Sequence, residues 1–510
     1  MADFLEIDGW SLTLDDIEHV AGTDAPEVRL AKTARTQVEA SRTVVDNAIA
    51  QKRVVYGITT GFGALADIVI PQDRIRELQT NLIRSHAAGV GAPLPEPEVR
   101  ATLLLRANVL AAGYSGVRPS LIELLLSLLN HRVHPVIPER GSVGASGDLA
   151  PLAHVALTLM GEGEAEHGGS RMPGGQALAI AGLAPVTLEA KEGLALINGT
   201  QVQTAIGVLA LLAAERAIET AEVAGAMSLE ALRGTPDAFD EAIQRLRPHP
   251  GQVTSAARLR TLLEQSEIRE SHREDDPRVQ DAYSLRCMPQ VHGAARQALS
   301  FVRGVLEIEA NSVTDNPLVF AGDGRILSGG NFHGQPVAQA LDVAALACAD
   351  LAAISERRIA RLIDPALSGL PPFLVGDPGV NSGLMMAQIV AAALVADIKL
   401  RAQPASIDTI PTDANREDHV SMGVGAALKL RDAVHLLETV LALELLTAAQ
   451  GLEFLKPLRP GRGVETAYAK LRERIAPLRR DREMGPDIRA AEALVRTGVF
   501  AAIVAGTSRA

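Results

Sequence analysis

The residues most suited to chemistry lie in a glycine- and serine-rich run over residues 141–154, with Ala145-Ser146-Gly147 at its centre. The run contains no Gly-Lys-Ser/Thr ending, and its glycines do not fit the dinucleotide pattern, so both kinds of phosphate loop are excluded. Asp148 can cap a helix, Pro151 is tolerated only in a first turn, and apolar residues follow at helical spacing. We therefore expect the tripeptide at the positive end of a helix, where negative charge developing on an oxygen is stabilised.

A bare Ala-Ser-Gly is most often an ordinary turn, but the full run resembles the signature of the aromatic amino-acid ammonia-lyases, which act on histidine, phenylalanine or tyrosine. The resemblance implies that the tripeptide cyclises and dehydrates into a methylidene-imidazolone (MIO), a prosthetic group made from the chain itself. Gly147 has no Cβ, so its nitrogen can approach the Ala145 carbonyl closely. Ser146 then loses its hydroxyl as water and leaves an electron-poor methylidene carbon. No external cofactor is then needed.

Further matches to this family reach from about residue 54 to 422 and imply a residue for each task of an ammonia elimination. Tyr56, in Tyr-Gly-Ile-Thr-Thr-Gly-Phe-Gly, matches the general base that removes the β-proton. Because a phenol has an unperturbed pKa near 10, it needs positive charge or hydrogen-bond donors nearby. Arg286 matches the clamp for the substrate carboxylate, since its guanidinium fork fits two oxygens. Considered singly, Tyr56 would be a core residue and Arg286 a surface ion-pair residue.

The resemblance implies roles for four more residues around the prosthetic group. Tyr283, in Gln-Asp-Ala-Tyr-Ser-Leu-Arg, would support the group or the proton traffic, and Gln280 would bind substrate or hold the ring. Asn198 would hydrogen-bond both the group and the substrate, although a helix-capping role is the simpler interpretation. Phe332, in Gly-Gly-Asn-Phe-His-Gly, would form a wall of the pocket.

Two positions favour histidine as the substrate. Ser85-His86 resembles the Ser-His pair of the histidine-specific members, where phenylalanine lyases usually have Phe-Leu and tyrosine lyases His-Leu. Glu417 resembles a glutamate of the same members. A carboxylate accepts an imidazole N–H, whereas a benzene ring leaves it unpaired at a cost of about 1–3 kcal/mol or more. His-Glu pairs also bind metals, but the helical ligand spacing is missing, so we expect no metal site.

Four residues depart from the histidine-specific pattern. Met288 replaces a usual Gln, Ala282 a Pro and His292 an apolar residue. Arg416 replaces the Gln that usually precedes the glutamate, and its guanidinium could pair with Glu417 and weaken its role at the imidazole. These departures bear on the substrate and leave the elimination chemistry untouched.

The composition narrows the class of protein. The 49 Lys and Arg against 61 Asp and Glu give a net charge of −12, and no basic patch with interleaved aromatics indicates nucleic-acid binding. Hydrophobic residues make up 47% but aromatics only 3%, so the core must be aliphatic. The two cysteines, Cys287 and Cys348, fit a reducing cytosol. The apolar run 205–214 ends at Glu215, and the N-terminus lacks a signal peptide, so we expect a soluble cytoplasmic protein.

The apolar spacing predicts a mainly α protein with long helices in residues 201–510 and a smaller, loop-rich region in residues 1–200 that carries the tripeptide and the proposed base. The clearest apolar stripe at helical spacing is Leu430, Ala433, Val434, Leu437, Val440 and Leu441. The resemblance implies a long-helix bundle of the ammonia-lyase/fumarase-like kind that assembles as a homotetramer.

The expected reaction is the elimination of ammonia from L-histidine to give trans-urocanate, with the electrophile derived from Ser146 capturing the α-amine. The expected partners are a small amino acid and further copies of the chain, without nucleic acid or membrane. A tyrosine or phenylalanine ammonia-lyase, or a 2,3-aminomutase on the same scaffold, is the nearer alternative. The distant alternative is a non-enzymatic helical binding protein that keeps the signature without cyclising it.

Overall fold

The computed structural model describes residues 4–274, 276 and 278–507, and the chain divides into two compact units. Unit 1 contains the residues up to Leu209 together with Arg303–Leu341 and Pro404–Leu428; unit 2 contains the remainder. The division expected near residue 200 treated each region as one continuous stretch. The chain instead returns twice to unit 1, and these returns place Phe332 and Glu417 in the same unit as Ser146.

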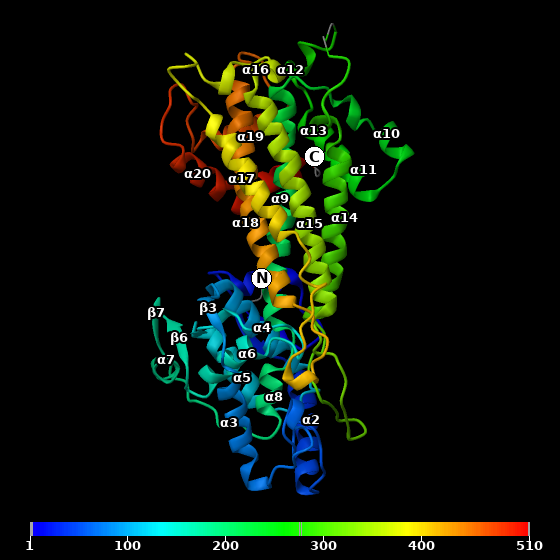
Figure 1. The fold of residues 1–510 in the computed structure, drawn as a ribbon, viewed down its shortest axis with the longest axis vertical. Coiled ribbons are helices and arrows are strands. Elements are labelled where there is room, and N and C mark those ends of the chain that lie inside the picture. The colour runs from blue at the N-terminus through cyan, green and yellow to red at the C-terminus, as the bar shows by residue number, and fades with distance from the viewer. Residues whose placement is uncertain (1–3, 275, 277, 508–510) are drawn as a thin grey trace. The chain divides into compact units, whose positions relative to one another are not determined.

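Unit 1 combines short helices with four small sheets (Figure 1). Its helices are α1 (Leu14–Ala21), α2 (Lys32–Ala50), α3 (Ile75–His86), α4 (Glu96–Ala111), α5 (Pro119–Asn130), α6 (Leu149–Leu159), α7 (Gly174–Ile180) and α8 (Glu192–Ile197). The strand pairs are β1 (Phe4–Ile7) with β2 (Glu27–Leu30), parallel, and β3 (Val90–Pro93) with β5 (Pro138–Arg140) and β8 (Leu318–Phe320) with β9 (Arg325–Leu327), both antiparallel. The three-stranded sheet has the order β4 (His134–Pro135), β6 (Glu164–His167), β7 (Ser170–Pro173).

Four long helices have residues in both units: α9 (Gln201–Ala231), α14 (Met288–Ala310), α15 (Gln335–Ile363) and α18 (Gly423–Glu453). Alanine and leucine are abundant in α9, α15 and α18, and these residues have high helix propensity. The other helices of unit 2 are α10 (Glu241–Leu246), α11 (Pro250–Leu262), α12 (Glu267–Glu270), α13 (Tyr283–Arg286), α16 (Pro365–Ser368), α17 (Met385–Arg401), α19 (Arg462–Arg472), α20 (Gly485–Arg496) and α21 (Val499–Thr507). The expected mainly α fold is confirmed.

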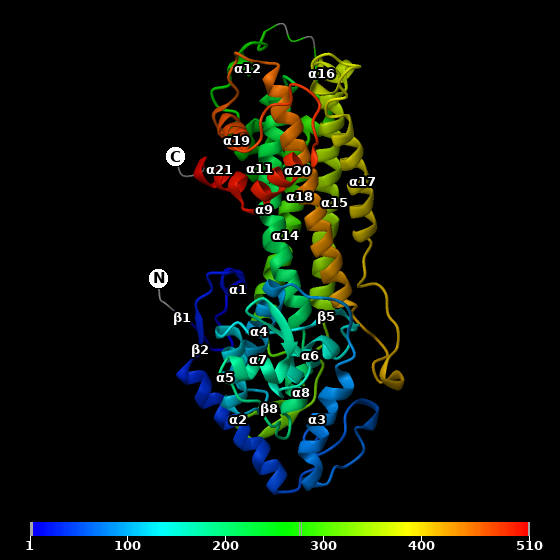
Figure 2. The ribbon, with the colours of Figure 1, turned by 90° about the vertical axis from the view of Figure 1, so that its left-hand side faces the viewer.

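The core of unit 2 is aliphatic, as the composition predicted, and all six residues of the Leu430–Leu441 stripe are buried on α18. Glu438 of the same helix is also buried, and its carboxylate pairs with Arg496. Within this unit α9, α15 and α18 run side by side (Figures 1 and 2). Arg358 of α15 donates to both carboxylate oxygens of Glu444 of α18 at 2.5 and 2.9 Å, and both side chains are fully buried.

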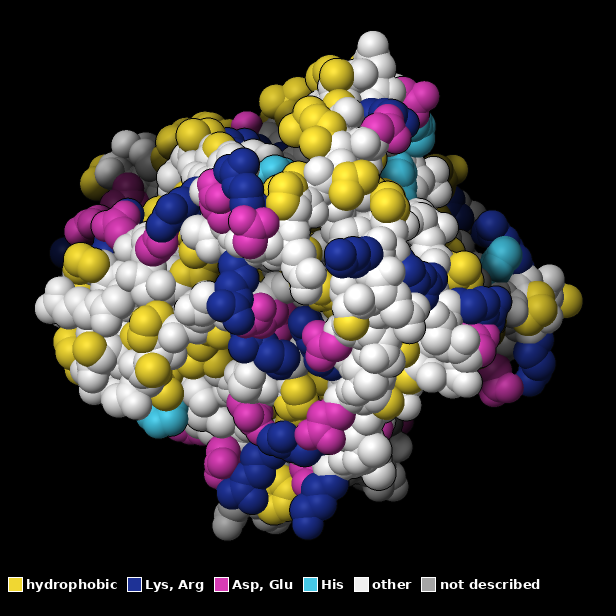
Figure 3. Space-filling view, turned by 90° about the horizontal axis from the view of Figure 1, so that it is seen from below, with side chains coloured by type: hydrophobic (Ala, Val, Ile, Leu, Met, Phe, Trp, Pro, Cys, Tyr) yellow, Lys and Arg dark blue, Asp and Glu magenta, His cyan; other side chains and the backbone are white. Residues whose placement is uncertain are grey.

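In the described part of the chain, α15 is the one helix long and apolar enough to cross a membrane by length and composition. Buried residues make up 61% of its apolar window, which is typical of a core helix. Seen from the end of unit 1 that carries α2 and α3, the surface has Lys and Arg side chains interspersed with Asp and Glu (Figure 3). Mixed charges of this kind give that face no strong field of one sign.

Replacing Arg358 by Met should lower the free energy of unfolding by about 3–5 kcal/mol, because Glu444 would remain buried without its counter-charge. The neighbouring Arg357→Met is the matched control, since Arg357 is 62% exposed in its pair with Glu356 and should cost less than about 1 kcal/mol. Urea titrations of both variants measure the difference. Equal losses would contradict the importance of the buried pair.

Candidate active site

Unit 1 contains a cavity of about 470 Å³, a size that suits a small-molecule ligand. Its walls come from α3, α6, α8 and the loops between the elements of the unit. The lining residues are Tyr56, Gly61, Phe62, Gly63, Leu65, Leu78, Asn81, Leu82, Ser85, His86, Ser146, Leu149, Leu194, Ile197, Asn198, Asn316, Phe332, Asp413 and Glu417. The cavity therefore brings together six predicted site residues: Tyr56, His86, Ser146, Asn198, Phe332 and Glu417.

The tripeptide lies directly before α6, at the positive helix end that the sequence predicted. Gly147 adopts a left-handed φ of +79°, and a Cβ there would lie 2.2 Å from the Gly199 carbonyl oxygen. The Asp148 N–H donates to that same oxygen at 2.7 Å. Only glycine fits at position 147, because both its conformation and its close approach to Gly199 exclude a side chain.

The carboxylate of Asp148 does not cap α6, contrary to the sequence-based expectation. It accepts from the backbone N–H of Gln203, in the first turn of α9, at 2.8 Å and from Ser142 Oγ at 3.2 Å. Burial raises the pKa of this carboxyl to about 7. Asp148 therefore ties the end of the tripeptide loop to α9, a helix that begins over fifty residues later in the chain.

Asn198 follows the last residue of α8 and donates through Nδ2 to the Ser146 carbonyl oxygen at 2.7 Å. This is the oxygen that becomes the ring carbonyl if the tripeptide cyclises. The Oδ1 atom of Asn198 is buried without a hydrogen-bond partner among the described residues. Asn198 is thus an amide fixed on the tripeptide, which fits the predicted contact with the prosthetic group.

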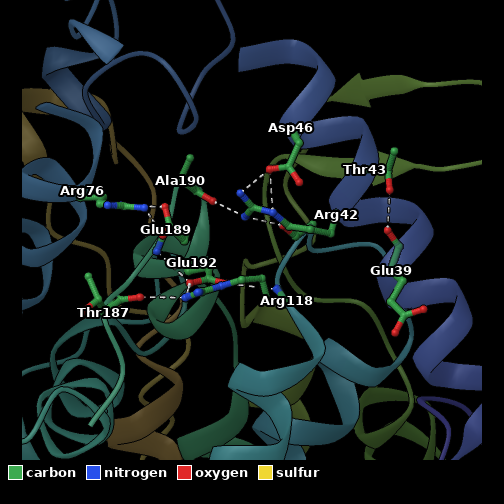
Figure 4. Close-up of polar contacts among 11 residues, drawn as sticks. Glu39, Arg42, Thr43, Asp46, Arg76, Arg118, Thr187, Glu189, Ala190 and Glu192 are labelled. Carbon is green, nitrogen blue, oxygen red and sulfur yellow. Dashed lines mark hydrogen bonds and ion pairs between the residues drawn. The ribbon is translucent and has the colours of Figure 1, made fainter. Parts of the chain in front are cut away.

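Charged residues anchor the start of α8 and thereby the position of Asn198 (Figure 4). Arg118 donates through Nε and Nη2 to the two carboxylate oxygens of the fully buried Glu192, at 2.8 and 2.7 Å. Arg42 donates to the Ala190 carbonyl at 2.9 Å. Lys191, in a left-handed conformation, pairs with Asp315 at 2.7 Å, and both side chains are fully buried. Such charge-assisted bonds leave α8 little freedom to shift.

Glu417 lies on a loop more than 250 residues from the tripeptide and contacts it directly. Ser146 Oγ donates to Glu417 Oε1 at 2.5 Å, and Thr412 Oγ1 donates to Oε2 at 2.5 Å. The turn between Thr412 and Glu417 contains three successive left-handed residues, 413–415. Arg416 points to Asp67 at 3.6 Å, with both side chains largely exposed, so the anticipated pairing of Arg416 with Glu417 does not occur.

His86 ends α3, and its Nδ1 lies 2.9 Å from the Leu82 carbonyl oxygen and 3.0 Å from Ser85 Oγ. A ring nitrogen facing a carbonyl must carry the proton, so this contact assigns the tautomer with hydrogen on Nδ1. In the neutral ring, Nε2 is then the acceptor.

Tyr56 accepts from the Gly63 N–H at 3.3 Å. Burial raises the pKa of its phenol, and the carboxylates of Asp413 and Glu417 raise it further against the lowering effect of that hydrogen bond. The cavity lining contains no Lys or Arg side chain. The positive charge that a tyrosine base requires is thus missing from the walls that this chain forms.

Gln280, Tyr283 and Arg286 belong to unit 2, and the chain does not bring them to its own cavity. The Arg286 guanidinium lies over the Tyr283 ring at 4.6 Å from its centroid, and Tyr283 is 70% exposed. Met288 and His292 are also in unit 2, fully buried on α14, so neither departure lines this cavity.

Three polar lining residues were missed by sequence analysis. Asn81 lies one helical turn before Ser85 on α3, so the helical period could have found it. Asn316 accepts from the Gly329 N–H at 2.8 Å and so ties its own loop to the loop that carries Phe332. Asp413 accepts from the Ala64 N–H, and no local pattern indicates that contact. Among the described residues, no group of three or more His, Cys, Asp or Glu is placed to hold a metal ion.

A family model for aromatic amino acid lyases matches residues 12–473. The chain belongs to the aromatic amino acid lyase family. This lyase is 56% identical over 494 residues to a histidine ammonia-lyase of Stigmatella aurantiaca. The alignment covers 97% of this chain and 96% of the relative. The crystal structure of histidine ammonia-lyase from Trypanosoma cruzi has a TM-score of 0.92 and 43% identity, covering 99% and 95% of the two chains. A tyrosine aminomutase from Streptomyces globisporus has a TM-score of 0.93 and 39% identity, covering 98% of each chain.

Gly144→Ala should destabilise this lyase, because the new Cβ would lie 2.2 Å from Ser421 Oγ at a left-handed φ of +70°. In the native chain, Ser421 Oγ donates to the Gly144 carbonyl oxygen at 3.0 Å. This hydrogen bond holds the tripeptide loop against the loop of Glu417. Gly169→Ala is the matched control, with a similar φ of +75° and open space around it.

The control should lose about 1–2 kcal/mol from backbone strain alone, and Gly144→Ala about 1–3 kcal/mol more from overpacking. Urea midpoints of the two variants measure this difference. Equal midpoints would show that the two loops are not held by this contact.

Proposed function

We propose that this chain is a histidine ammonia-lyase, which eliminates ammonia from L-histidine and releases trans-urocanate. The observation that carries the proposal is the contact between Ser146 and Glu417 in a cavity that also contains His86. Curated relatives that are 50–56% identical over nearly the whole chain have this name, which supports the choice of substrate.

The residues of the tripeptide loop fit a methylidene-imidazolone made from Ala145, Ser146 and Gly147. Ser146 faces the cavity, Gly147 occupies a site where a side chain is excluded, and Asn198 donates to the Ser146 carbonyl oxygen. The mature group would supply an electrophile that makes the amine of the substrate a better leaving group. Asn198 and the N-terminus of α6 stabilise negative charge on that carbonyl oxygen.

Glu417 and His86 select the imidazole of the substrate. In the precursor, Glu417 Oε1 is occupied by the Ser146 hydroxyl, and loss of this hydroxyl on maturation frees the oxygen for an imidazole N–H. Thr412 holds the other carboxylate oxygen and so fixes the direction of the free one. His86 Nε2 adds a second acceptor. A benzene ring offers no hydrogen-bond donor to these groups and would leave the carboxylate unpaired.

Gln280, Tyr283 and Arg286 complete the site from another copy of the chain in a homotetramer. The lining contains no Lys or Arg for the substrate carboxylate. Arg286 lies against the exposed Tyr283 ring, and its Nε atom has no hydrogen-bond partner among the described residues. A guanidinium brought close to Tyr56 would lower the pKa of its phenol and fit it to remove the β-proton. The enzyme would work in the cytoplasm on a small amino acid.

A tyrosine or phenylalanine ammonia-lyase, or a 2,3-aminomutase, is the second candidate, because the tyrosine aminomutase shares the fold at 39% identity. An aminomutase returns ammonia to the β-carbon, so its product is a β-amino acid. Glu417 in the cavity disfavours a phenylalanine substrate, since an apolar ring would leave its carboxylate unpaired. A non-enzymatic binding protein would leave Ser146 intact.

Ser146→Ala should keep the fold and lose at least about 10³-fold in urocanate formation, more than removal of one hydrogen-bond donor costs. The reason is that alanine has no hydroxyl to lose and cannot form the electrophile. Ser170→Ala, at an exposed strand position, is the control and should be fully active. Activity is followed by ultraviolet absorbance with L-histidine, and the fold by circular dichroism. A fully active Ser146→Ala enzyme would overturn the proposed function.

A further inference from the structure

Arg106, in the middle of α4, contacts the turn that faces the tripeptide. Its side chain is fully buried, and Nη1 donates to the Asn198 carbonyl oxygen at 2.9 Å and to Gln201 Oε1 at 2.7 Å. Gln201 Nε2 in turn donates to Thr314 Oγ1 at 2.7 Å. A single guanidinium nitrogen therefore holds both sides of Gly199.

Burial of the Arg106 guanidinium costs free energy of desolvation. Burial lowers its pKa to about 10, with the charges of Asp315 and Asp148 opposing this, so it stays protonated at neutral pH. Its Nε and Nη2 atoms have no hydrogen-bond partner among the described residues. A buried cation with two unsatisfied nitrogens destabilises the fold. The one nitrogen that donates hydrogen bonds, Nη1, donates to the turn at Gly199.

The turn at Gly199 is shaped to receive Arg106 on one side and the tripeptide on the other. A Cβ on Gly199 would lie 2.7 Å from Arg106 Nη1 and 2.5 Å from Gln201 Oε1. On the opposite side Gly147 pairs with Gly199 in a parallel bridge, and Asn198 Nδ2 holds the Ser146 carbonyl. The position of Arg106 thus sets the surface against which Ser146 and Gly147 lie.

We propose that Arg106 is a positioning residue for maturation of the tripeptide: it fixes the Asn198–Gly199 turn, which holds Ser146 and Gly147 in the conformation that closes the ring. This inference rests on the proposed function, because it requires that the tripeptide cyclises. Arg106 touches neither the reacting atoms nor the substrate cavity.

Maturation of the tripeptide is a cyclisation with loss of two waters, and it needs no oxidant, reductant or other co-reactant. The Gly147 nitrogen bonds to the Ala145 carbonyl carbon, and its proton moves to the carbonyl oxygen. That oxygen leaves as water with the Ser146 amide proton, which creates a carbon–nitrogen double bond in the ring. Ser146 then loses its Cα proton and its hydroxyl as a second water, and a carbon–carbon double bond forms. The chain becomes lighter by two waters.

The test compares two buried arginines of the same helix by intact mass. In purified Arg106→Met, most chains should keep one or both waters, whereas Arg106→Lys, which keeps the charge and one donor, should lie between Met and the native chain. Arg100→Met is the matched control: Arg100 is also buried on α4, but it donates to the carbonyls of Val20 and Leu129, away from the tripeptide. It should lose thermal stability and still shed both waters completely.

Complete water loss in Arg106→Met would overturn the role, and so would incomplete loss in Arg100→Met to the same extent, since any destabilisation would then suffice. If Arg106→Met is insoluble, Arg106→Lys decides: incomplete water loss supports the proposal and complete loss overturns it. The native chain separates the two hypotheses. A native mass that retains both waters defeats the proposed function itself, whereas native loss with unaffected Arg106 variants defeats only the inference.

Discussion

The site depends on the close approach of two glycines, Gly147 and Gly199, whose backbones lie nearer than any side chain would allow. Helix α6 begins two residues after Gly147. Helix α8 ends two residues before Gly199, and α9 begins two residues after it. Asp148 closes the arrangement, because its N–H bonds to Gly199 and its carboxylate to the first turn of α9. Three helix ends are therefore fixed by one backbone contact, and the oxygens and N–H groups that surround Ser146 follow from it.

The charged and polar groups of the site lie on two sides, one buried within unit 1 and one facing the cavity. On the buried side, the ion pairs of Glu192 and Lys191 and the guanidinium of Arg106 hold the backbone that carries Asn198. On the open side, Glu417 and His86 present acceptors to the cavity. Buried charges of this kind add little net stability, and their value is geometric: they restrict the loop to one arrangement.

Short motifs in the sequence predicted that a helix follows Ala145-Ser146-Gly147. They also predicted that Ser146, Asn198, Glu417 and His86 belong to one site. The sequence could not predict the partner of Asp148 or the direction of Arg416, since both depend on which distant element packs beside them. Arg106 went unnoticed although a charged residue within the apolar stretch Leu103–Leu110 is a usable signal. The role of Arg286 stays a prediction, because Arg286 belongs to unit 2 and is not among the residues that line the cavity.

The most direct test of this account is product formation by the purified chain with L-histidine, L-tyrosine and L-phenylalanine in parallel, followed by ultraviolet absorbance. The account predicts urocanate from L-histidine and little or no coumarate or cinnamate, because Glu417 lies in the cavity where an imidazole N–H can pair with its carboxylate. Coumarate or cinnamate as the main product would contradict it, since the carboxylate in the cavity would then have no part in choosing the substrate.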